Sequence, residues 1–250
     1  MLNETNLLEN NSNKEFFSKL AKILRSQMII VDIGANSGKY TFEVNKALTS
    51  GSIYAIEPDP IKFEKLKEKC SQWEKDSDNK IHLLQIGIGD RNGQSNFFFS
   101  NSPTHSILKE NISQVKQELD DAIAWEEITV DIYQLDTLFK PIKPDIIKID
   151  VKGKELPILQ GCVGILKTGK AKFLIQFSHQ DSSEIETSKK KIYEFMKSFD
   201  YYPSNFYGMI LFRNPKQDHK SRLIIDTFKS ATRRIISPSL RHWIREFIKK

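Results

Sequence analysis

The chain has 250 residues, of which 39% are hydrophobic and 28% charged, so it can bury a core of ordinary size for one α/β domain. Its two cysteines, Cys70 and Cys162, lie far apart and outside any Cys-x-x-Cys pair. This argues against a disulfide framework or a zinc cluster and favours a reducing compartment. The sequence shows neither a long apolar run nor the pattern of a secretory signal, so we expect no transmembrane helix and a cytoplasmic location.

The positive charge is concentrated at the C-terminal end of the chain. The net charge is +6, yet residues 216–250 hold ten basic and three acidic residues, whereas the other 215 residues hold 28 basic and 29 acidic ones. A uniformly basic nucleic-acid-binding domain would differ from this pattern. We therefore expect three parts: an N-terminal helical extension at 1–27, a central domain at 28–214 and a basic helical tail at 215–250.

The predicted elements alternate between helices and strands. A first helix is predicted to begin near Ser12, which has capping-box spacing to Glu15. Further helices are predicted at 40–48, 60–73, 156–166 and 185–199, and strands at 28–33, 52–56, 81–88, 146–149, 172–177, 202–204 and 209–212. Additional strands are predicted at 96–99 and 127–133. This order predicts an α/β fold with a doubly wound, mostly parallel seven-stranded sheet that ends in an antiparallel hairpin.

The segment Val-Asp-Ile-Gly-Ala-Asn-Ser-Gly at 31–38 joins the first predicted strand to a helix. Its glycines, Gly34 and Gly38, allow a sharp turn and a close approach to a ligand. The spacing fails the P-loop pattern, and Asn36 stands where a dinucleotide fingerprint needs glycine. The remaining pattern, acidic-x-Gly-x-x-x-Gly, suits a nucleoside ligand that has no pyrophosphate.

Acidic residues follow several of the predicted strands, where ligands bind in such sheets. Glu57 ends the second strand and is placed to accept hydrogen bonds from two ribose hydroxyls. Asp32 is a candidate partner of a ligand ammonium group, and Asp90 of an adenine amino group. Each of these acids alone is more often a cap or a solvated group, but their common order and spacing favours a binding site.

The sequence resembles the FkbM family of methyltransferases over roughly residues 28–212. Five stretches carry the resemblance: 31–41, Tyr-Ala-Ile-Glu-Pro-Asp-Pro at 54–60, Gly-Ile-Gly-Asp at 87–90, Gln-Leu-Asp-Thr-Leu at 134–138 and Ile-Lys-Ile-Asp-Val-Lys-Gly-Lys-Glu at 147–155. The resemblance implies a Rossmann-like methyltransferase domain, the cofactor S-adenosylmethionine and an O-methyltransferase acting on a hydroxyl of a glycan or secondary metabolite. It further implies that the cofactor is surrounded by Gly34, Asn36, Gly38, Glu57 and Asp90, and that Asp150 faces the methyl-transfer site.

Two positions depart from the family pattern. Lys152 stands where the family has glutamate, and Gln176 stands where glutamate is common. Both changes remove negative charge near the expected site, which keeps open a non-catalytic binding module on a degenerate methyltransferase fold. Lys152 either pairs with Asp150 or binds an anionic acceptor such as a phosphorylated glycan, and the sequence leaves both interpretations open.

Transfer to a hydroxyl needs a base, and the candidates are Asp150, Glu155 and His179. Each has a structural alternative: Asp150 as a helix N-cap, Glu155 as a first-turn acid and His179 as an ordinary loop residue. We predict no metal ligands. A nucleic-acid methyltransferase is a further alternative, but the chain lacks the Asn/Asp-Pro-Pro-aromatic motif of amino-directed enzymes after the fourth strand.

Two amphipathic helices are predicted in the basic tail, on either side of Pro238. Helices of this kind lie on anionic membrane surfaces, here the inner face of the membrane, or dock on their own domain or on a second copy in a homodimer. The sequence leaves these interpretations open.

Overall fold

The computed structural model describes residues 14–100, 106–108, 125–177 and 183–217. Its main sheet has seven strands in the order β10-β11-β9-β8-β1-β2-β3. The strands are β1 Met28–Ile33, β2 Gly51–Ile56, β3 Asn79–Leu84, β8 Ile146–Ile149, β9 Lys172–Ile175, β10 Tyr202–Phe206 and β11 Met209–Arg213. Only β11 runs antiparallel to its neighbours, β9 and β10. The predicted mostly parallel seven-stranded sheet and its antiparallel hairpin are therefore confirmed.

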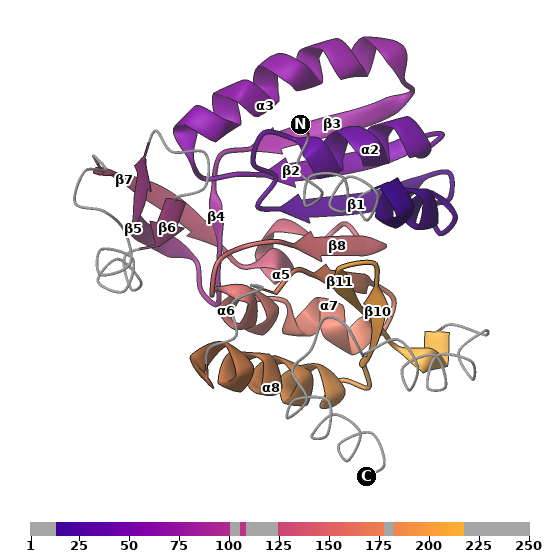
Figure 1. The fold of residues 1–250 in the computed structure, drawn as a ribbon, viewed down its shortest axis with the longest axis vertical. Coiled ribbons are helices and arrows are strands. Elements are labelled where there is room, and N and C mark those ends of the chain that lie inside the picture. Colours follow the sequence, from indigo (N-terminus) through magenta and orange to yellow (C-terminus); the bar gives the residue numbers. More distant parts are fainter. Residues whose placement is uncertain (1–13, 101–105, 109–124, 178–182, 218–250) are drawn as a thin grey trace, which may run out of the picture.

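Helices cover both faces of this sheet (Figure 1). They are α2 Lys39–Ala47, α3 Pro60–Trp73, α5 Leu135–Leu138, α6 Glu155–Gln160, α7 Val163–Thr168 and α8 Ser183–Lys197, together with a helix at 14–21. Neighbouring residues of β1 point to opposite faces: Ile30 packs in the core with α2 and α3, and Val31 in the core with α6, α7 and α8. The helix at 14–21 adds Phe16 to the first core, where its ring contacts that of Phe206 at 5.5 Å between centroids.

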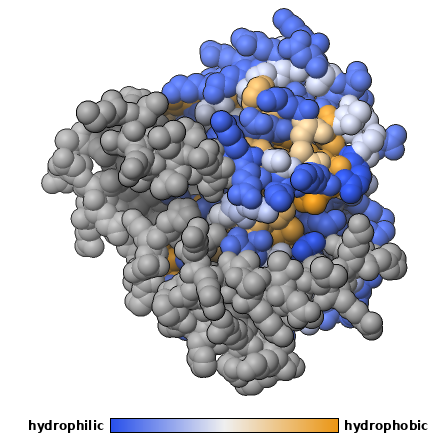
Figure 2. Space-filling model, turned by 45° about the vertical axis from the view of Figure 1, so that its right-hand side comes forward, coloured by the Kyte–Doolittle hydropathy of each residue, from blue (hydrophilic) through white to orange (hydrophobic). Residues whose placement is uncertain are grey.

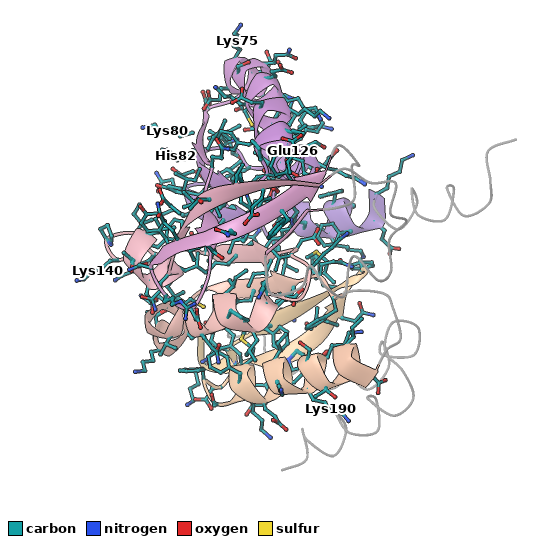
Figure 3. All side chains as sticks on the ribbon, turned by 90° about the vertical axis from the view of Figure 1, so that its left-hand side faces the viewer. Lys75, Lys80, His82, Glu126, Lys140 and Lys190 are labelled. Carbon is teal, nitrogen blue, oxygen red and sulfur yellow. The ribbon has the colours of Figure 1, made fainter. Side chains whose placement is uncertain are left out.

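A second, four-stranded sheet lies beside the main one (Figures 1 and 3). It consists of β4 Gly87–Ile88, β5 Gly93–Ser100, β6 Ser106–Leu108 and β7 Trp125–Tyr133, in the order β4-β7-β5-β6. The two additional strands predicted from the sequence are therefore present and pair with each other. The single strand predicted at 81–88 is wrong, because β3 ends at Leu84 and Gly87 and Ile88 pair with β7 instead.

The helix predicted at 156–166 is interrupted in the structure. A side chain at Gly161 would overlap the carbonyl oxygen of Gly89, so the chain passes unusually close to the second sheet at this point. Asp136 then caps the following helix, α7, because its carboxylate accepts from the backbone N–H groups of Gly164 and Ile165 at 2.6 and 2.9 Å. Two short helices, α6 and α7, therefore replace the single predicted one.

The surface of the described part is mainly hydrophilic on the face shown in Figure 2, with small hydrophobic patches between hydrophilic residues. The helix α3 shows the cause, since Leu66 and Cys70 are buried while Glu64, Lys67 and Glu68 are exposed. No helix within the described residues is long and apolar enough to cross a membrane. Ser12, at the predicted start of the first helix, and the tail helices predicted beyond residue 217 lie outside the described residues.

Candidate active site

The loop that joins β1 to α2 turns sharply at the carboxyl edge of the sheet. Gly34 and Asn36 adopt left-handed φ values of 73° and 51°. The backbone N–H groups of Gly34 and Ala35 both donate to the carbonyl oxygen of Ile56 at 3.0 Å, which ties the loop to the end of β2. A Cβ at residue 34 would overlap the carbonyl oxygen of Asp150. Glycine is therefore required here because the backbone after β8 crosses directly against the loop.

The carboxylate of Glu57 is fixed where β2 ends. The side chain is buried, and its two oxygens accept from the backbone N–H groups of Asn36 at 2.8 Å and Asp59 at 3.0 Å. Burial raises the pKa of Glu57, although these two hydrogen bonds and the charge of Lys62 work in the opposite direction. Each carboxylate oxygen has a second lone pair, so the group can still accept from hydroxyl donors in the pocket.

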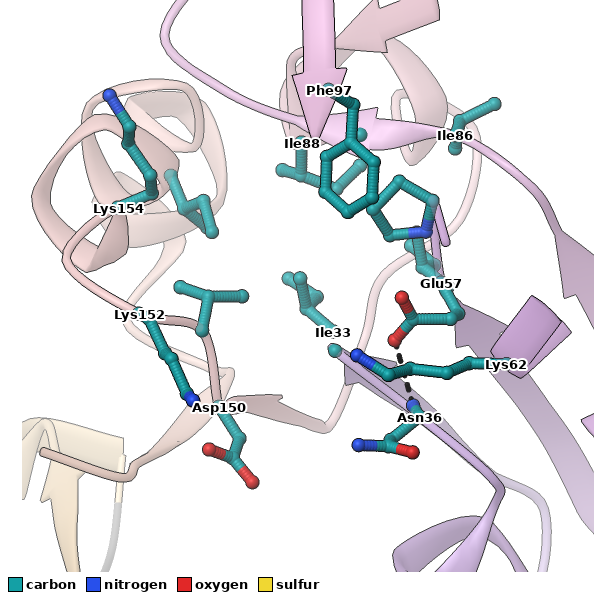
Figure 4. A pocket seen from close by; sticks show the side chains of 16 residues that line it. Ile33, Asn36, Glu57, Lys62, Ile86, Ile88, Phe97, Asp150, Lys152 and Lys154 are labelled. Atoms are coloured by element: carbon teal, nitrogen blue, oxygen red, sulfur yellow. Dashed lines mark hydrogen bonds between the residues drawn. The ribbon is translucent and has the colours of Figure 1, made fainter. Parts of the chain in front are cut away.

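A pocket of about 280 Å³ opens where β1, β2 and β8 end. Figure 4 shows three sides to it: Asn36, Glu57 and Lys62 on one, Asp150, Lys152 and Lys154 opposite, and the apolar side chains of Ile86, Ile88 and Phe97 across the top. Phe97 comes from β5, so the second sheet supplies part of the pocket wall. The site thus combines a fixed carboxylate, basic groups and an apolar surface, a lining suited to a nucleoside ligand with a polar second substrate.

Lys148 lies beneath this pocket, in the middle of the apolar strand β8. Its Nζ is 2.9 Å from Asp32 Oδ1 and 3.5 Å from Asp150 Oδ2, and it donates to the carbonyl oxygen of Gly34 at 2.9 Å. Asp32 is completely buried and also accepts from the hydroxyl of Thr41 at 2.7 Å. One ammonium group therefore connects β1, the glycine loop and the end of β8.

Among the described lysines, Lys148 shares this degree of burial only with Lys62. The lysines labelled in Figure 3 (Lys75, Lys80, Lys140 and Lys190) point outward around the molecule, whereas Lys148 is only 4% exposed. Burial alone would lower the pKa of Lys148, but the charges of Asp32 and Asp150 outweigh it and raise the pKa. The lysine is therefore held as a charged group inside the sheet.

The structure brings four of the predicted site residues to the pocket: Gly34, Asn36, Glu57 and Asp150. Asp32 lies below it, paired with Lys148, and is placed to support the loop rather than to touch a ligand. His179 lies outside the described residues.

Gly38 and Asp90 lie outside the pocket lining. A Cβ at Gly38 would approach Leu66 Cδ1 at 2.6 Å and Trp73 Cη2 at 2.9 Å, so this glycine lets α2 pack against α3. Asp90 is exposed after β4, in the second sheet, and its carbonyl oxygen accepts from Gln134 Nε2 at 2.7 Å. The sequence placed Asp90 at the end of a main-sheet strand, and the different strand boundary moves it away from that edge.

Glu155 begins α6 and is 5% exposed, outside the pocket lining. Its Oε1 accepts from the backbone N–H of Gly153 at 3.3 Å. Burial raises the pKa of Glu155 from 4.5 to about 7. A pKa in this range suits a general base, but the position of the carboxylate favours a part in holding the loop before α6.

The raised pKa of Glu155 makes the stability of the protein depend on pH. The folded state holds this proton more tightly than the unfolded chain, so the contribution of Glu155 to the free energy of unfolding falls as pH rises from 4.5 through about 7. This change in the free energy of unfolding amounts to about 3 kcal/mol, and we expect it to be absent in Glu155→Gln, whose side chain does not titrate. Urea denaturation of both proteins at closely spaced pH values measures the difference, and parallel pH profiles would contradict the assignment.

Sequence reasoning missed several residues of the site, among them Lys148, Phe97 and Lys62. The sequence could have indicated the role of Lys148, because a lysine among the isoleucines of a buried strand is expected to have an acidic partner inside the protein. Phe97 carried a weaker signal, since it alternates with Phe99 on one face of a predicted strand. Lys62 carried none, because its position on α3 predicts an ordinary exposed helix residue. Within the described residues, no group of three or more His, Cys, Asp or Glu side chains is placed to hold a metal ion.

Comparison with known families decides which class of protein this is. The model of the methyltransferase FkbM domain matches residues 32–203, well over half of the chain. The chain belongs to the FkbM methyltransferase family. It is therefore a methyltransferase, and the family and fold are those of enzymes that generally use S-adenosylmethionine. The predicted family is confirmed, and the matched range contains every residue that lines the pocket.

Individual relatives of this FkbM-family methyltransferase are distant. It is 26% identical over 203 residues to the 2-O-methyltransferase NoeI of Sinorhizobium fredii, covering 75% of this chain and 80% of NoeI. It is 23% identical to the hexuronic acid methyltransferase AglP of Haloferax volcanii, covering 56% of this chain and 52% of AglP. The crystal structure of a methyltransferase FkbM from Methylobacillus flagellatus has a TM-score of 0.51 and 17% identity, covering 77% of this chain and 45% of that one, and shows the shared fold.

Proposed function

We propose that this methyltransferase binds S-adenosylmethionine in the pocket at the ends of β1, β2 and β8 and methylates a hydroxyl of a glycan or a secondary metabolite. The observation that carries the proposal is Glu57, a buried carboxylate that two backbone N–H groups hold at the pocket wall. Such a group matches the paired hydroxyls of a ribose. The names of the relatives support a sugar acceptor, because NoeI is a 2-O-methyltransferase and AglP acts on a hexuronic acid.

The pocket residues fit a nucleoside cofactor. Glu57 would hold the ribose, and the apolar side chains of Ile86, Ile88 and Phe97 offer a surface for the adenine. When bound, the cofactor supplies a methyl group on a sulfonium, and much of the rate of such a reaction comes from alignment. The loop anchored on Ile56 and Lys148 provides a rigid edge for this alignment.

Asp150 is the candidate base among the residues that line the pocket. Its side chain is 53% exposed and its Oδ2 lies 3.5 Å from Lys148 Nζ, so the carboxylate can reach an acceptor and hold the proton that the hydroxyl releases. Gln176, which the sequence singled out together with Lys152, lies outside the pocket lining. Lys152 does line the pocket and changes its charge.

The variant Glu57→Gln tests the ribose assignment. It keeps the size of the side chain but removes the charge and one acceptor oxygen, so we expect S-adenosylhomocysteine to bind about tenfold to a hundredfold more weakly. Calorimetric titration measures the affinity, and thermal unfolding without ligand checks that the variant is folded. The matched control is Glu64→Gln on the exposed side of α3, which should bind like the wild type. Equal affinities of the two variants would refute the assignment.

A further inference from the structure

Three lysines line the pocket, and they approach it from two sides. Lys62, on α3, is 8% exposed, and its Nζ lies 3.1 Å from Asp59 Oδ2. Figure 4 shows its ammonium group reaching into the space beside Glu57. Lys152 and Lys154 lie on the opposite side, in the short segment that joins β8 to α6. The pocket therefore has basic groups on both of its polar walls.

The lysines on opposite walls influence each other. Burial and the positive charge of Lys62 both lower the pKa of Lys152, and the nearby carboxylate of Asp150 compensates only in part. The two ammonium groups thus repel each other across the space in which the substrates of the enzyme would meet. An anion bound between the walls would remove this repulsion and stabilise the charged form of Lys152.

The two walls have different tasks under the proposed function. Glu57 and Asn36 on one wall are assigned to the cofactor, which leaves the wall formed by Asp150, Lys152 and Lys154 for the acceptor. On this wall Lys152 follows Asp150 by two residues and lines the pocket beside it, so the acceptor meets a basic group next to the candidate base.

We propose that Lys152 selects an acceptor sugar whose methylated hydroxyl lies close to a negative group, either a carboxylate or a phosphate. A uronate and a phosphorylated sugar both meet this description. The inference rests on the proposed function, since it takes the cofactor wall as assigned. It adds a class of acceptor that the family alone does not specify, and it gives Lys152 a chemical role.

Binding to the complex of the full chain with S-adenosylhomocysteine tests this without knowledge of the natural acceptor. The probes are two matched pairs: p-nitrophenyl β-D-glucuronide with p-nitrophenyl β-D-glucoside, and glucose 6-phosphate with glucose. We expect the charged member of at least one pair to bind about tenfold or more tightly than its neutral partner, and added salt to reduce this difference. The pair that shows the larger difference identifies carboxylate or phosphate as the preferred group.

Variants then test whether the preference for the charged probe depends on Lys152. Lys152→Gln is expected to weaken binding of the charged probe about tenfold while changing the affinity of its neutral partner much less, and Lys152→Arg to retain most of the affinity for the charged probe. Lys67→Gln on the exposed side of α3 serves as the control. Failure of the wild type to bind S-adenosylhomocysteine would refute the proposed function itself. If that ligand binds but charged and neutral probes bind equally, or none binds at millimolar concentration, the acceptor inference alone is overturned.

Discussion

Replacing Lys148 with methionine is expected to lower the free energy of unfolding by about 3–5 kcal/mol. Methionine fits the space of the lysine chain but cannot neutralise Asp32, which would remain completely buried without its 2.9 Å ion pair. The variant also removes the donor that holds the carbonyl oxygen of Gly34 at 2.9 Å. Urea denaturation of the purified proteins measures the change, and we expect the affinity for S-adenosylhomocysteine to fall with it, because the cofactor loop loses its anchor.

A double-mutant cycle separates the ion pair from packing. The pair Lys148→Met and Asp32→Asn removes both charges, so it should recover much of the stability that Lys148→Met alone loses. Lys67→Met provides the exposed control, since the ion pair of Lys67 with Glu64 is about 60% exposed on both sides and should contribute less than about 1 kcal/mol. If Lys148→Met and Lys67→Met lower the free energy of unfolding equally, Lys148 does not organise the site.

Gly34→Ala is expected to be the second most damaging change, with a loss of about 2–5 kcal/mol in the free energy of unfolding. Part of this is the cost of a side chain at a φ of 73°, and the remainder is the overlap of the new methyl group with the carbonyl oxygen of Asp150. Thermal and urea unfolding measure the loss. Relief of the overlap would also push the end of β8 away from the glycine loop and widen the pocket.

Gly208→Ala is the matched control for this prediction. Gly208 also has a positive φ, 100°, but a methyl group there would meet no atom within 4 Å. We therefore expect Gly208→Ala to show only the conformational part, about 1–2 kcal/mol. Equal losses at the two positions would show that the contact with Asp150 costs nothing. Because Gly34 is needed for this packing, its replacement is a poor test of cofactor contact, and Glu57 is a better one.

The main sheet could be predicted because short parallel strands buried on both faces are nearly continuous apolar runs. Residues 28–33 and 146–149 have this composition, and the structure places β1 and β8 at the same bounds. Gly87 and Ile88 extend the apolar run of β3, so the sequence could not show that they pair with β7 in another sheet. At the break between α6 and α7, Gly161 lies against the carbonyl oxygen of Gly89, a contact between residues distant in sequence that the sequence does not reveal.

The residues of the candidate site that could be predicted are those that directly follow the strands of the main sheet. Asn36, Glu57 and Asp150 line the pocket because three neighbouring parallel strands end at one edge of the sheet. The ion pair that Asp32 forms could not be predicted from its local sequence, since its partner Lys148 lies in a strand 116 residues later in the chain. Of the lysines that line the pocket, the sequence singled out only Lys152. The approach of Lys62 could not be predicted, because it depends on how α3 packs.

The proposed roles of Asp150 and Lys152 both depend on the binding of S-adenosylmethionine in the pocket beside Glu57. Calorimetric titration of the wild-type chain with S-adenosylmethionine and S-adenosylhomocysteine tests it most directly. We expect saturable binding of both at one site per chain, with a thermal stabilisation equivalent to about 2.7 kcal/mol when the ligand is at roughly 100 times its dissociation constant. Absence of binding to a well-folded sample would contradict the account and identify the protein as a methyltransferase fold that has lost its cofactor site.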